Sequence, residues 1–319
     1  MAGHGYPAAV TLLIDHVTKR FAQTVALDDL AFEVPRGRIF GFLGANGAGK
    51  TTTMRICLGI LNADEGTVQW DGTPTTDLPR QTFGYLPEER GLYPRMTVAD
   101  QLVYFASLYG HPADRARADA LHWLTRFRIP DYADRRAEEL SKGNQQKVQF
   151  IAAILHRPDV LLMDEPFTGL DPVNLALLRE AFLELRDQGR TVVFSTHQME
   201  LAEAMCESVA IVDRGRVVAG GTIRDLKRAS GRRIVRIGLN GSGDHSWLER
   251  LPGVLVRRAG VDRTELELID GIEPEAVLAA AVDGGTTVTH FELDEPSLEA
   301  LFIEHVGRAP DDGERTLAP

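Results

Sequence analysis

Apolar residues recur along the chain with two different spacings, and the changes of spacing divide it into regions. Short apolar runs at residues 11–15, 31–34 and 39–43 predict strands near the amino end. From about residue 98 to residue 155, apolar side chains recur every three or four positions, which predicts helices. A continuous apolar run then returns at residues 160–163, as expected of a buried parallel strand.

Strands and helices alternate after that run. The pattern predicts helices at residues 175–188 and 199–206, a strand at 191–195, and a hairpin of strands 209–212 and 216–219. Alternating strands and helices favour an α/β fold with a largely parallel sheet. We therefore expect one α/β domain over residues 10–228, with a helical insertion at about 98–155.

The last third of the chain has a different order of elements. Strands are predicted at 234–239, 254–258, 264–268 and 286–293, with helices at 246–251, 273–281 and 297–306. The order β-α-β-β-α-β indicates a small α+β, ferredoxin-like domain at residues 232–307. Residues 308–319 are polar and rich in proline, which predicts a disordered tail.

Composition narrows the class of protein. The chain has 319 residues and a formal net charge of −11, with 44% hydrophobic and 25% charged residues. These values are typical of a globular protein. The acidic balance argues against a nucleic-acid partner, because such proteins usually carry a basic domain.

The number of cysteines and the lengths of the apolar stretches indicate in which cellular compartment the chain is expected. Cys57 and Cys206 are expected in helices as buried small side chains, so no disulfide framework is predicted and a reducing cytoplasm fits. No apolar stretch approaches the ~18 residues that span a bilayer, and residues 1–7 do not have the form of a signal peptide. Work at a membrane would therefore need a second chain.

The strongest chemical motif follows the strand at 39–43. Residues 44–52 read G-A-N-G-A-G-K-T-T and lead into a helix-compatible segment, which is the phosphate-loop pattern in its strand–loop–helix context. Glycines allow the backbone to turn its N–H groups toward a polyphosphate, and the helix adds its positive dipole end. Lys50 is expected between the β- and γ-phosphates, and Thr51 on Mg²⁺.

A second motif ends the apolar strand 160–163. Asp164 and Glu165 follow it directly. Ligands bind at the carboxyl ends of strands in open α/β sheets, so Asp164 is expected to face the Mg²⁺ held by Thr51. Glu165 is expected near the γ-phosphate, where a base could activate water.

Further motifs in the same order resemble those of ABC-type ATPases. L-S-K-G-N at 140–144 resembles the signature sequence, T-G-L-D at 168–171 the D-loop, S-T-H at 195–197 the switch histidine, and P-E-E at 87–89 the glutamine loop. The resemblance covers about residues 10–228 and is closest to the ATPase subunits of ABC-2 type exporters, including sodium and drug exporters. The domain at 232–307 resembles one that often follows the ATPase in that subgroup.

The resemblance implies a role for each matching residue. Glu165 would be the general base, His197 would contact the γ-phosphate, and Phe21 would stack on adenine. Asp164 and Glu88 would join Thr51 at Mg²⁺, Glu88 also being a catalytic candidate. The implied ATP-binding residues, together with Gly44, are Phe21, Asn46, Gly47, Ala48, Gly49, Lys50, Thr51, Thr52, Ser141, Gly143 and Asp171. Ser141, Gly143 and Asp171 would act across a head-to-tail dimer.

The chain departs from the family pattern at two positions. Glu88 stands where the family usually has glutamine, and a carboxylate there adds negative charge beside the phosphates. Lys142 stands at a signature position usually held by glycine. Its side chain either points away from the nucleotide or helps to neutralise phosphate and contact the partner subunit.

The resemblance implies a motor subunit that binds and hydrolyses ATP and drives export through a separate ABC-2 type permease. We expect a homodimer on the inner face of the cell membrane, without nucleic acid. A groove between the Glu88 loop and the helical insertion, near Tyr85, Tyr93 and Tyr104, is expected to receive a permease helix. Two alternatives stay open: an ABC-type ATPase acting on ribosomes or DNA, and a regulatory or self-resistance ATPase.

Overall fold

The chain folds into two compact units that divide between Gly221 and Thr222, seven residues before the predicted domain end at 228. The structure is a computed structural model and describes residues 11–89, 91–240, 247–260, 263–269, 272–283 and 286–307. Residues 1–7 and the predicted tail 308–319 lie outside this described part.

Two sheets build the first unit. One has the strand order β2-β1-β4-β5, and the other has the order β10-β9-β3-β8-β7-β6. The strands of the first sheet are β1 (Thr11–Phe21), β2 (Thr24–Pro35), β4 (Glu65–Trp70) and β5 (Thr73–Pro74). Those of the second are β3 (Ile39–Leu43), β6 (Phe83–Leu86), β7 (Val160–Met163), β8 (Thr191–Thr196), β9 (Ser208–Asp213) and β10 (Arg216–Thr222).

The central strands of the second sheet run parallel. β3 pairs in parallel with both β8 and β9, and β7 pairs in parallel with both β6 and β8. β3, β7 and β8 are buried along their whole length, which explains why their sequences are continuous apolar runs. This arrangement brings the carboxyl ends of β3, β7 and β8 to one edge of the sheet.

Strand β1 is longer than the pattern of residues 11–15 predicts. Its pairing with β2 shifts between Ile14 and Val17 and again near Lys19, and His16 has a positive φ of 49°. These bulges move the buried side chains from even positions (Leu12, Ile14) to Val17. A bulge breaks the two-residue alternation, so the sequence pattern loses the strand where the structure continues it.

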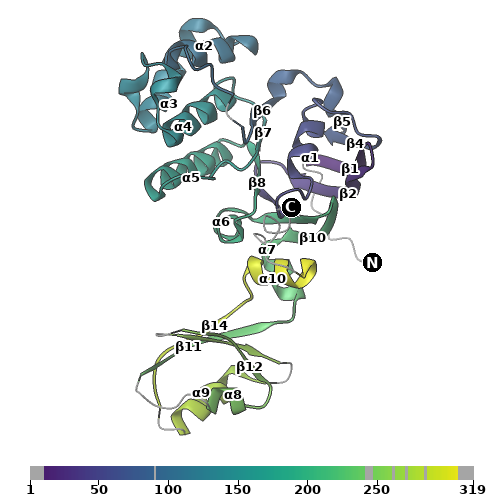
Figure 1. Cartoon of the computed structure of the whole chain (residues 1–319), viewed down its shortest axis with the longest axis vertical. Helices are drawn as coiled ribbons and strands as arrows, with labels where there is room; N and C mark the ends of the chain where they lie inside the picture. Colours follow the sequence, from purple (N-terminus) through teal and green to yellow (C-terminus); the bar gives the residue numbers. More distant parts are fainter. Residues whose placement is uncertain are drawn as a thin grey trace. The chain divides into compact units, whose positions relative to one another are not determined.

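Helices surround the second sheet. α1 (Lys50–Cys57) follows β3, and the insertion is built from α2 (Val98–Leu108), α3 (Ala113–Arg126) and α4 (Lys142–Ile154). In Figure 1 these three helices gather on one side with α5 (Pro172–Asp187) beside them. α6 (Met199–Met205) ends just before Cys206, so the prediction that this buried cysteine lies inside a helix was wrong by one residue. Short 3₁₀ turns span Thr75–Asp77, Arg80–Thr82, Pro130–Tyr132 and Ala137–Glu139.

A run of aromatic rings joins the insertion to the sheet. Phe127 at the end of α3 packs on Phe150 of α4, with ring centroids 5.5 Å apart. Phe150 stacks on Phe182 of α5 at 5.7 Å, and Phe182 meets Phe194 of β8 edge-on at 5.7 Å. All four rings are fully buried, so the insertion and the catalytic sheet share one packed interior.

The second unit contains a four-stranded antiparallel sheet of order β12-β13-β11-β14. Its elements are α7 (Ile223–Ala229), β11 (Arg233–Asn240), α8 (Trp247–Arg250), β12 (Val254–Ala259), β13 (Thr264–Leu268), α9 (Pro274–Asp283), β14 (Thr287–Asp294) and α10 (Leu298–Val306). Residues of α8 and α9 bury one face of the sheet around Val235, Ile237 and Leu266 (Figure 1). The order of elements and of strands is that of a ferredoxin-like fold, as predicted.

Candidate functional site

The loop between β3 and α1 is tightly constrained. Gly47 and Gly49 have positive φ angles of 79° and 107°, which only glycine adopts easily. A Cβ on Gly44 would lie 2.4 Å from the carbonyl oxygen of Val212, so no side chain fits there. α1 then begins at Lys50, with Gly49 as its N-cap and no side chain covering its first N–H groups. Such free N–H groups at a helix start form a site for anions.

Lys50 is buried inside this loop. Its Nζ donates to the carbonyl oxygens of Gly44 (2.7 Å) and Ala45 (3.2 Å) and lies 3.5 Å from Oε1 of Glu165. Only 6% of the lysine is exposed. A buried ammonium group held by weak neutral acceptors can transfer its hydrogen bonds to a phosphate, which is a stronger, charged acceptor.

Asp164 and Glu165 follow β7 and contact the loop directly. Thr51 Oγ1 donates to Oδ2 of Asp164 at 2.6 Å, and Nδ1 of His197 lies 3.1 Å from Oε1 of Glu165. Asp164 is 1% exposed and Glu165 7%. Glu165 has a left-handed φ of 47°, a strained conformation for a residue with a side chain that typically occurs at functional sites.

The hydroxyl of Ser195 forms hydrogen bonds with both Asp164 and Glu165. It donates to Oδ1 of Asp164 at 2.6 Å and accepts the backbone N–H of Glu165 at 2.9 Å. Thr168 adds a bond of 3.2 Å from Oγ1 to Oε2 of Glu165. Sequence reasoning assigned no role to Ser195 or Thr168. A serine in a buried strand, two residues before a histidine and opposite an Asp-Glu strand end, is the signal that could have found Ser195.

The phosphate loop, Asp164 and Glu165 line a hollow of about 330 Å³. His197 contacts Glu165 but does not line this hollow. Glu88 completes the rim of the hollow, and its pKa is raised by partial burial and by the negative charges of Asp164 and Glu165, which outweigh the opposing effect of Lys50. The lining residues are Ala26, Asn46, Gly47, Gly49, Lys50, Thr51, Thr52, Glu88, Asp164 and Glu165. The structure therefore brings most of the predicted phosphate and metal residues together.

The oxygen atoms at this site suit a magnesium ion that the phosphates of a bound nucleotide would also coordinate. Among the described residues, no cluster of three or more histidine, cysteine, aspartate or glutamate side chains can hold a metal alone. The hydroxyl of Thr51 and the carboxylate of Asp164 are hard oxygen ligands, which suit an ion that takes one or two carboxylates and completes its shell with phosphates and water.

Other predicted residues lie away from this hollow. Phe21 does not line it and is 44% exposed, with the ammonium of Lys19 5.5 Å from its ring centroid. Ser141 caps α4 through the N–H of Asn144, and Asp171 caps α5. Neither these two residues nor Gly143 lines the hollow of its own chain.

The signature helix α4 also contacts the loops that carry the site. Nε2 of Gln149 donates to the carbonyl oxygens of Pro87 (3.4 Å) and Glu89 (2.9 Å), on either side of Glu88. Nε2 of Gln146 donates to the carbonyl oxygen of Pro166 at 3.1 Å, next to Glu165. The helix that begins at the signature sequence therefore fixes the backbone on both sides of the hollow.

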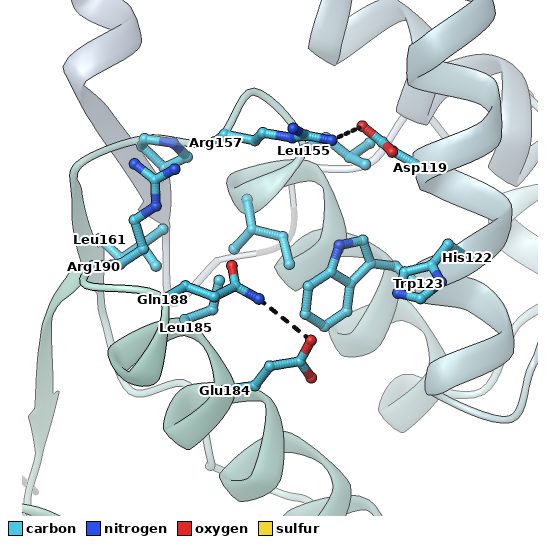
Figure 2. A pocket seen from close by; sticks show the side chains of 12 residues that line it. Asp119, His122, Trp123, Leu155, Arg157, Leu161, Glu184, Leu185, Gln188 and Arg190 are labelled. Carbon is cyan, nitrogen blue, oxygen red and sulfur yellow. Dashed lines mark hydrogen bonds and ion pairs between the residues drawn. The ribbon is translucent and has the colours of Figure 1, made fainter.

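A larger hollow of about 480 Å³ lies near the amino ends of β7 and β8, between α3 and α5 (Figure 2). Its charged residues pair within the chain: Arg157 with Asp119 (3.1 Å), Arg190 with Asp159 (3.0 Å) and Glu184 with Arg126 (3.4 Å). Paired charges do not converge on a ligand as the groups around Lys50 do, so this larger hollow is a weaker candidate.

Comparison with known proteins identifies the family. The profile described as ABC transporter matches residues 27–168. An ABC transporter ATP-binding protein of Bacillus subtilis, YhaQ, is 45% identical over 296 residues, covering 93% of this chain and 98% of that protein. The chain belongs to the ABC transporter ATP-binding proteins. Since this family binds and hydrolyses ATP, the chain is an ATPase, as predicted.

Further matches place this ABC ATPase in the exporter subgroup. The profile of the DrrA1-3-like ATP-binding protein C-terminal domain matches residues 221–306. The chain is similar to the linearmycin resistance ATP-binding protein LnrL of Bacillus subtilis (29% identity; 93% of this chain, 98% of that protein) and to the Nod factor export ATP-binding protein I of Burkholderia pseudomallei (38%; 92% and 95%).

A solved structure described as the ATP-binding subunit of an ABC transporter has the same fold. It superposes with a TM-score of 0.65 at 32% identity, over 70% of this chain and 94% of that one. ATP-binding subunits of this family work with membrane permeases. In this ABC ATPase, no helix of the described residues is long and apolar enough to cross a bilayer.

Proposed function

We propose that this ABC ATPase drives export through a separate ABC-2 type permease, as one half of a head-to-tail homodimer that closes on ATP. One observation carries the proposal: the hollow is lined by the phosphate loop and the carboxylates, but not by Ser141, Gly143 or Asp171. Ser141 and Asp171 are exposed at the starts of α4 and α5. Each chain therefore carries the phosphate-binding part of a nucleotide site. It also carries, at Ser141 and Asp171, a surface that could complete the same site in a second copy.

In the proposed site, the loop N–H groups, Lys50 and Thr52 bind the phosphates of ATP. Thr51, Asp164 and Glu88 would hold Mg²⁺, which would supply positive charge against the phosphates. Glu165 accepts a proton from the attacking water, and His197, 3.1 Å from Glu165, contacts the γ-phosphate. Phe21 stacks on the adenine.

Charge gives the dimer its dependence on ATP. The hollow already contains Glu88, Asp164 and Glu165 against Lys50, so triphosphate adds negative charge that needs donors from outside the chain. The N-terminus of α4, capped by Ser141, supplies N–H groups and a positive dipole end from a second copy. Loss of the γ-phosphate weakens that attraction and shifts the population toward the open dimer.

A groove on the first unit is the proposed docking site for the permease. It has a volume of about 220 Å³ and a mixed lining of apolar, aromatic and polar side chains. Its lining residues are Leu58, Gly59, Ile60, Thr75, Thr76, Leu78, Arg80, Phe83, Tyr85 and Tyr109. Of the three tyrosines predicted at such a groove, only Tyr85 lines it. Tyr93 (47% exposed) stacks on Phe105 and meets Tyr104 (42% exposed), and these two form a separate exposed aromatic cluster. We propose that a short cytoplasmic helix of the permease binds in the groove and holds the ATPase at the inner face of the membrane.

The relatives support export as the direction of transport, because their names state Nod factor export and linearmycin resistance. The cargo is selected by the permease. Co-expression of this chain with an ABC-2 permease from a neighbouring gene, followed by purification from detergent-solubilised membranes, tests the assignment. We expect the two chains to co-purify, and Ile60→Asp in the groove to abolish this. Recovery of the ATPase without the permease, or steeply salt-dependent binding to RNA or DNA, would contradict the proposal.

A further inference from the structure

The first turn of α4 and the first turn of α5 meet at Gly143 and Asn174. A Cβ placed on Gly143 would lie 3.0 Å from Nδ2 of Asn174 and 3.9 Å from a methyl group of Leu170. Gly143 has an ordinary helical backbone without a positive φ. A side chain here would therefore press on the neighbouring amide of the same chain, although the backbone conformation would allow one.

The amide of Asn174 is fixed in place. Its Nδ2 donates to Oδ2 of Asp171 at 2.6 Å, and its backbone N–H donates to Oδ1 of the same carboxylate at 2.9 Å. Both oxygens of Asp171 are thus bound by one residue. Since hydrogen bonds to a carboxylate are stronger than neutral ones, a displacement of the amide away from Gly143 would strain its bonds to Asp171.

The loop that precedes α5 is tied at its other end as well. Thr168 donates to Glu165 at 3.2 Å, so residues 168–171 are held between the carboxylate of Glu165 and the amide of Asn174. The loop 168–171 is therefore fixed at both ends, at Thr168 by Glu165 and at Asp171 by Asn174, which adjoins Gly143.

We infer that Asn174 is a positioning residue that locks the signature turn at Gly143 to the loop carrying Asp171, so that both segments present one rigid surface. The inference rests on the proposed function, in which that surface binds the ATP of a second copy. It adds one point to the resemblance, which places a second chain's nucleotide against Gly143: the space at this position is also limited by Asn174 of the same chain.

A suppression experiment tests this assignment through turnover. Gly143→Ala should push the amide off Asp171 and lower kcat roughly tenfold with the KM for ATP unchanged, since contacting residues are strongly coupled and Lys50 is untouched. Adding Asn174→Ala to the same chain removes the obstruction and should restore most of the lost kcat. Gly91→Ala, where a Cβ meets nothing within 4 Å, is the matched control. If kcat of the double variant is as low as that of Gly143→Ala alone, the inference is wrong.

A second measurement separates this inference from the dimer proposal. In the nucleotide-free monomer, Gly143→Ala should lower Tm by about 2–4 °C in the natural background and should not lower it in the Asn174→Ala background. This coupling in Tm does not depend on ATP or on a second copy. If the coupling is present but a Glu165→Gln variant stays monomeric in ATP, the contact is real and the dimer is wrong. Additive Tm changes would refute the contact itself.

Discussion

The two units of the chain use charged residues in opposite ways. In the first unit, Lys50, Asp164 and Glu165 are buried at the ends of strands around an open hollow. In the second unit, Glu267 is held by two arginines, Arg232 at 2.7 Å and Arg257, and Arg232 also pairs with Glu304 at 3.3 Å. The first arrangement places its hydrogen-bonded charges beside a hollow that could receive a ligand, and the second pairs its charges with one another.

Backbone conformation differs in the same way. Every described non-glycine residue with a positive φ lies in the first unit, and one of them is Glu165. The described part of the second unit has none. At Glu165 the strained backbone lies in the candidate site, and such strain is typically retained where function needs it. The comparison indicates that substitutions in the first site change activity, while equivalent ones in the second unit change stability.

The largest expected effect comes from replacing the proposed base. Glu165→Gln should lower turnover by ~10²–10⁴-fold, the usual contribution of a positioned base, while ATP still binds. It should also trap an ATP-dependent dimer in size-exclusion chromatography. The same exchange in the second unit, Glu267→Gln, is the matched control and should leave turnover within about twofold of the natural chain, as expected for a residue outside the site. Retained turnover in Glu165→Gln would refute the base assignment.

Removing the phosphate lysine should act on binding. Lys50→Ala should weaken ATP affinity roughly 10- to 100-fold, which is what a few hydrogen bonds to a charged group contribute. Equilibrium titration with a fluorescent ATP analogue measures this change. Lys227→Ala, in α7 of the second unit, is the control and should bind ATP normally. Unchanged affinity in Lys50→Ala would exclude the proposed phosphate contact.

The second unit should instead respond to pH. The hydrogen bond and charge of Arg232 lower the pKa of Glu267 below its ordinary value, despite partial burial. A carboxylate with a lowered folded pKa stabilises the fold above its unfolded pKa, and this stability is lost as pH falls through the folded value. Glu267→Gln should cost about 1–3 kcal/mol at neutral pH by leaving arginine donors unpaired, and the difference should vanish in acid. Hydrogen exchange in β11 and β13 measures it, and a pH-independent difference would contradict the ion-pair explanation.

The smallest effect is expected at Lys142. This residue is exposed at the first position of α4, and the structure therefore favours a side chain that points to solvent. Lys142→Gly should change ATPase activity by less than about twofold, in line with surface substitutions generally. A large loss in steady-state turnover would show instead that the lysine contacts phosphate or the second copy.

Most of the fold could be predicted because hydrophobic spacing matched the elements. The buried strand at 160–163 was placed at its observed bounds, and the order of elements in the second unit gave the ferredoxin-like arrangement. β1 was too short in the prediction because its bulge near His16 reverses which side chains face inward. Short-range patterns report a strand only while its register with its neighbour is regular.

The residues of the candidate site also divide into those that the sequence predicted and those that it did not. The phosphate loop, Asp164, Glu165 and His197 were predicted from motifs that are contiguous in sequence, and the structure brings them into contact. Ser195, Gln149 and Asn174 were missed because their importance depends on contacts between distant segments, 31 residues apart for Ser195 and Asp164. For Ser195, the position two residues before His197 was the available signal, but it becomes informative only when the pairing of β8 with β7 is known.

The aromatic rings from Phe127 to Phe194 have a consequence for how the first unit unfolds. The helical insertion has its largest side chains interleaved with those of α5 and β8, so melting it would expose the interior of the catalytic sheet. Heating should therefore give a single cooperative transition for both, and residues 98–155 expressed alone should lack stable structure.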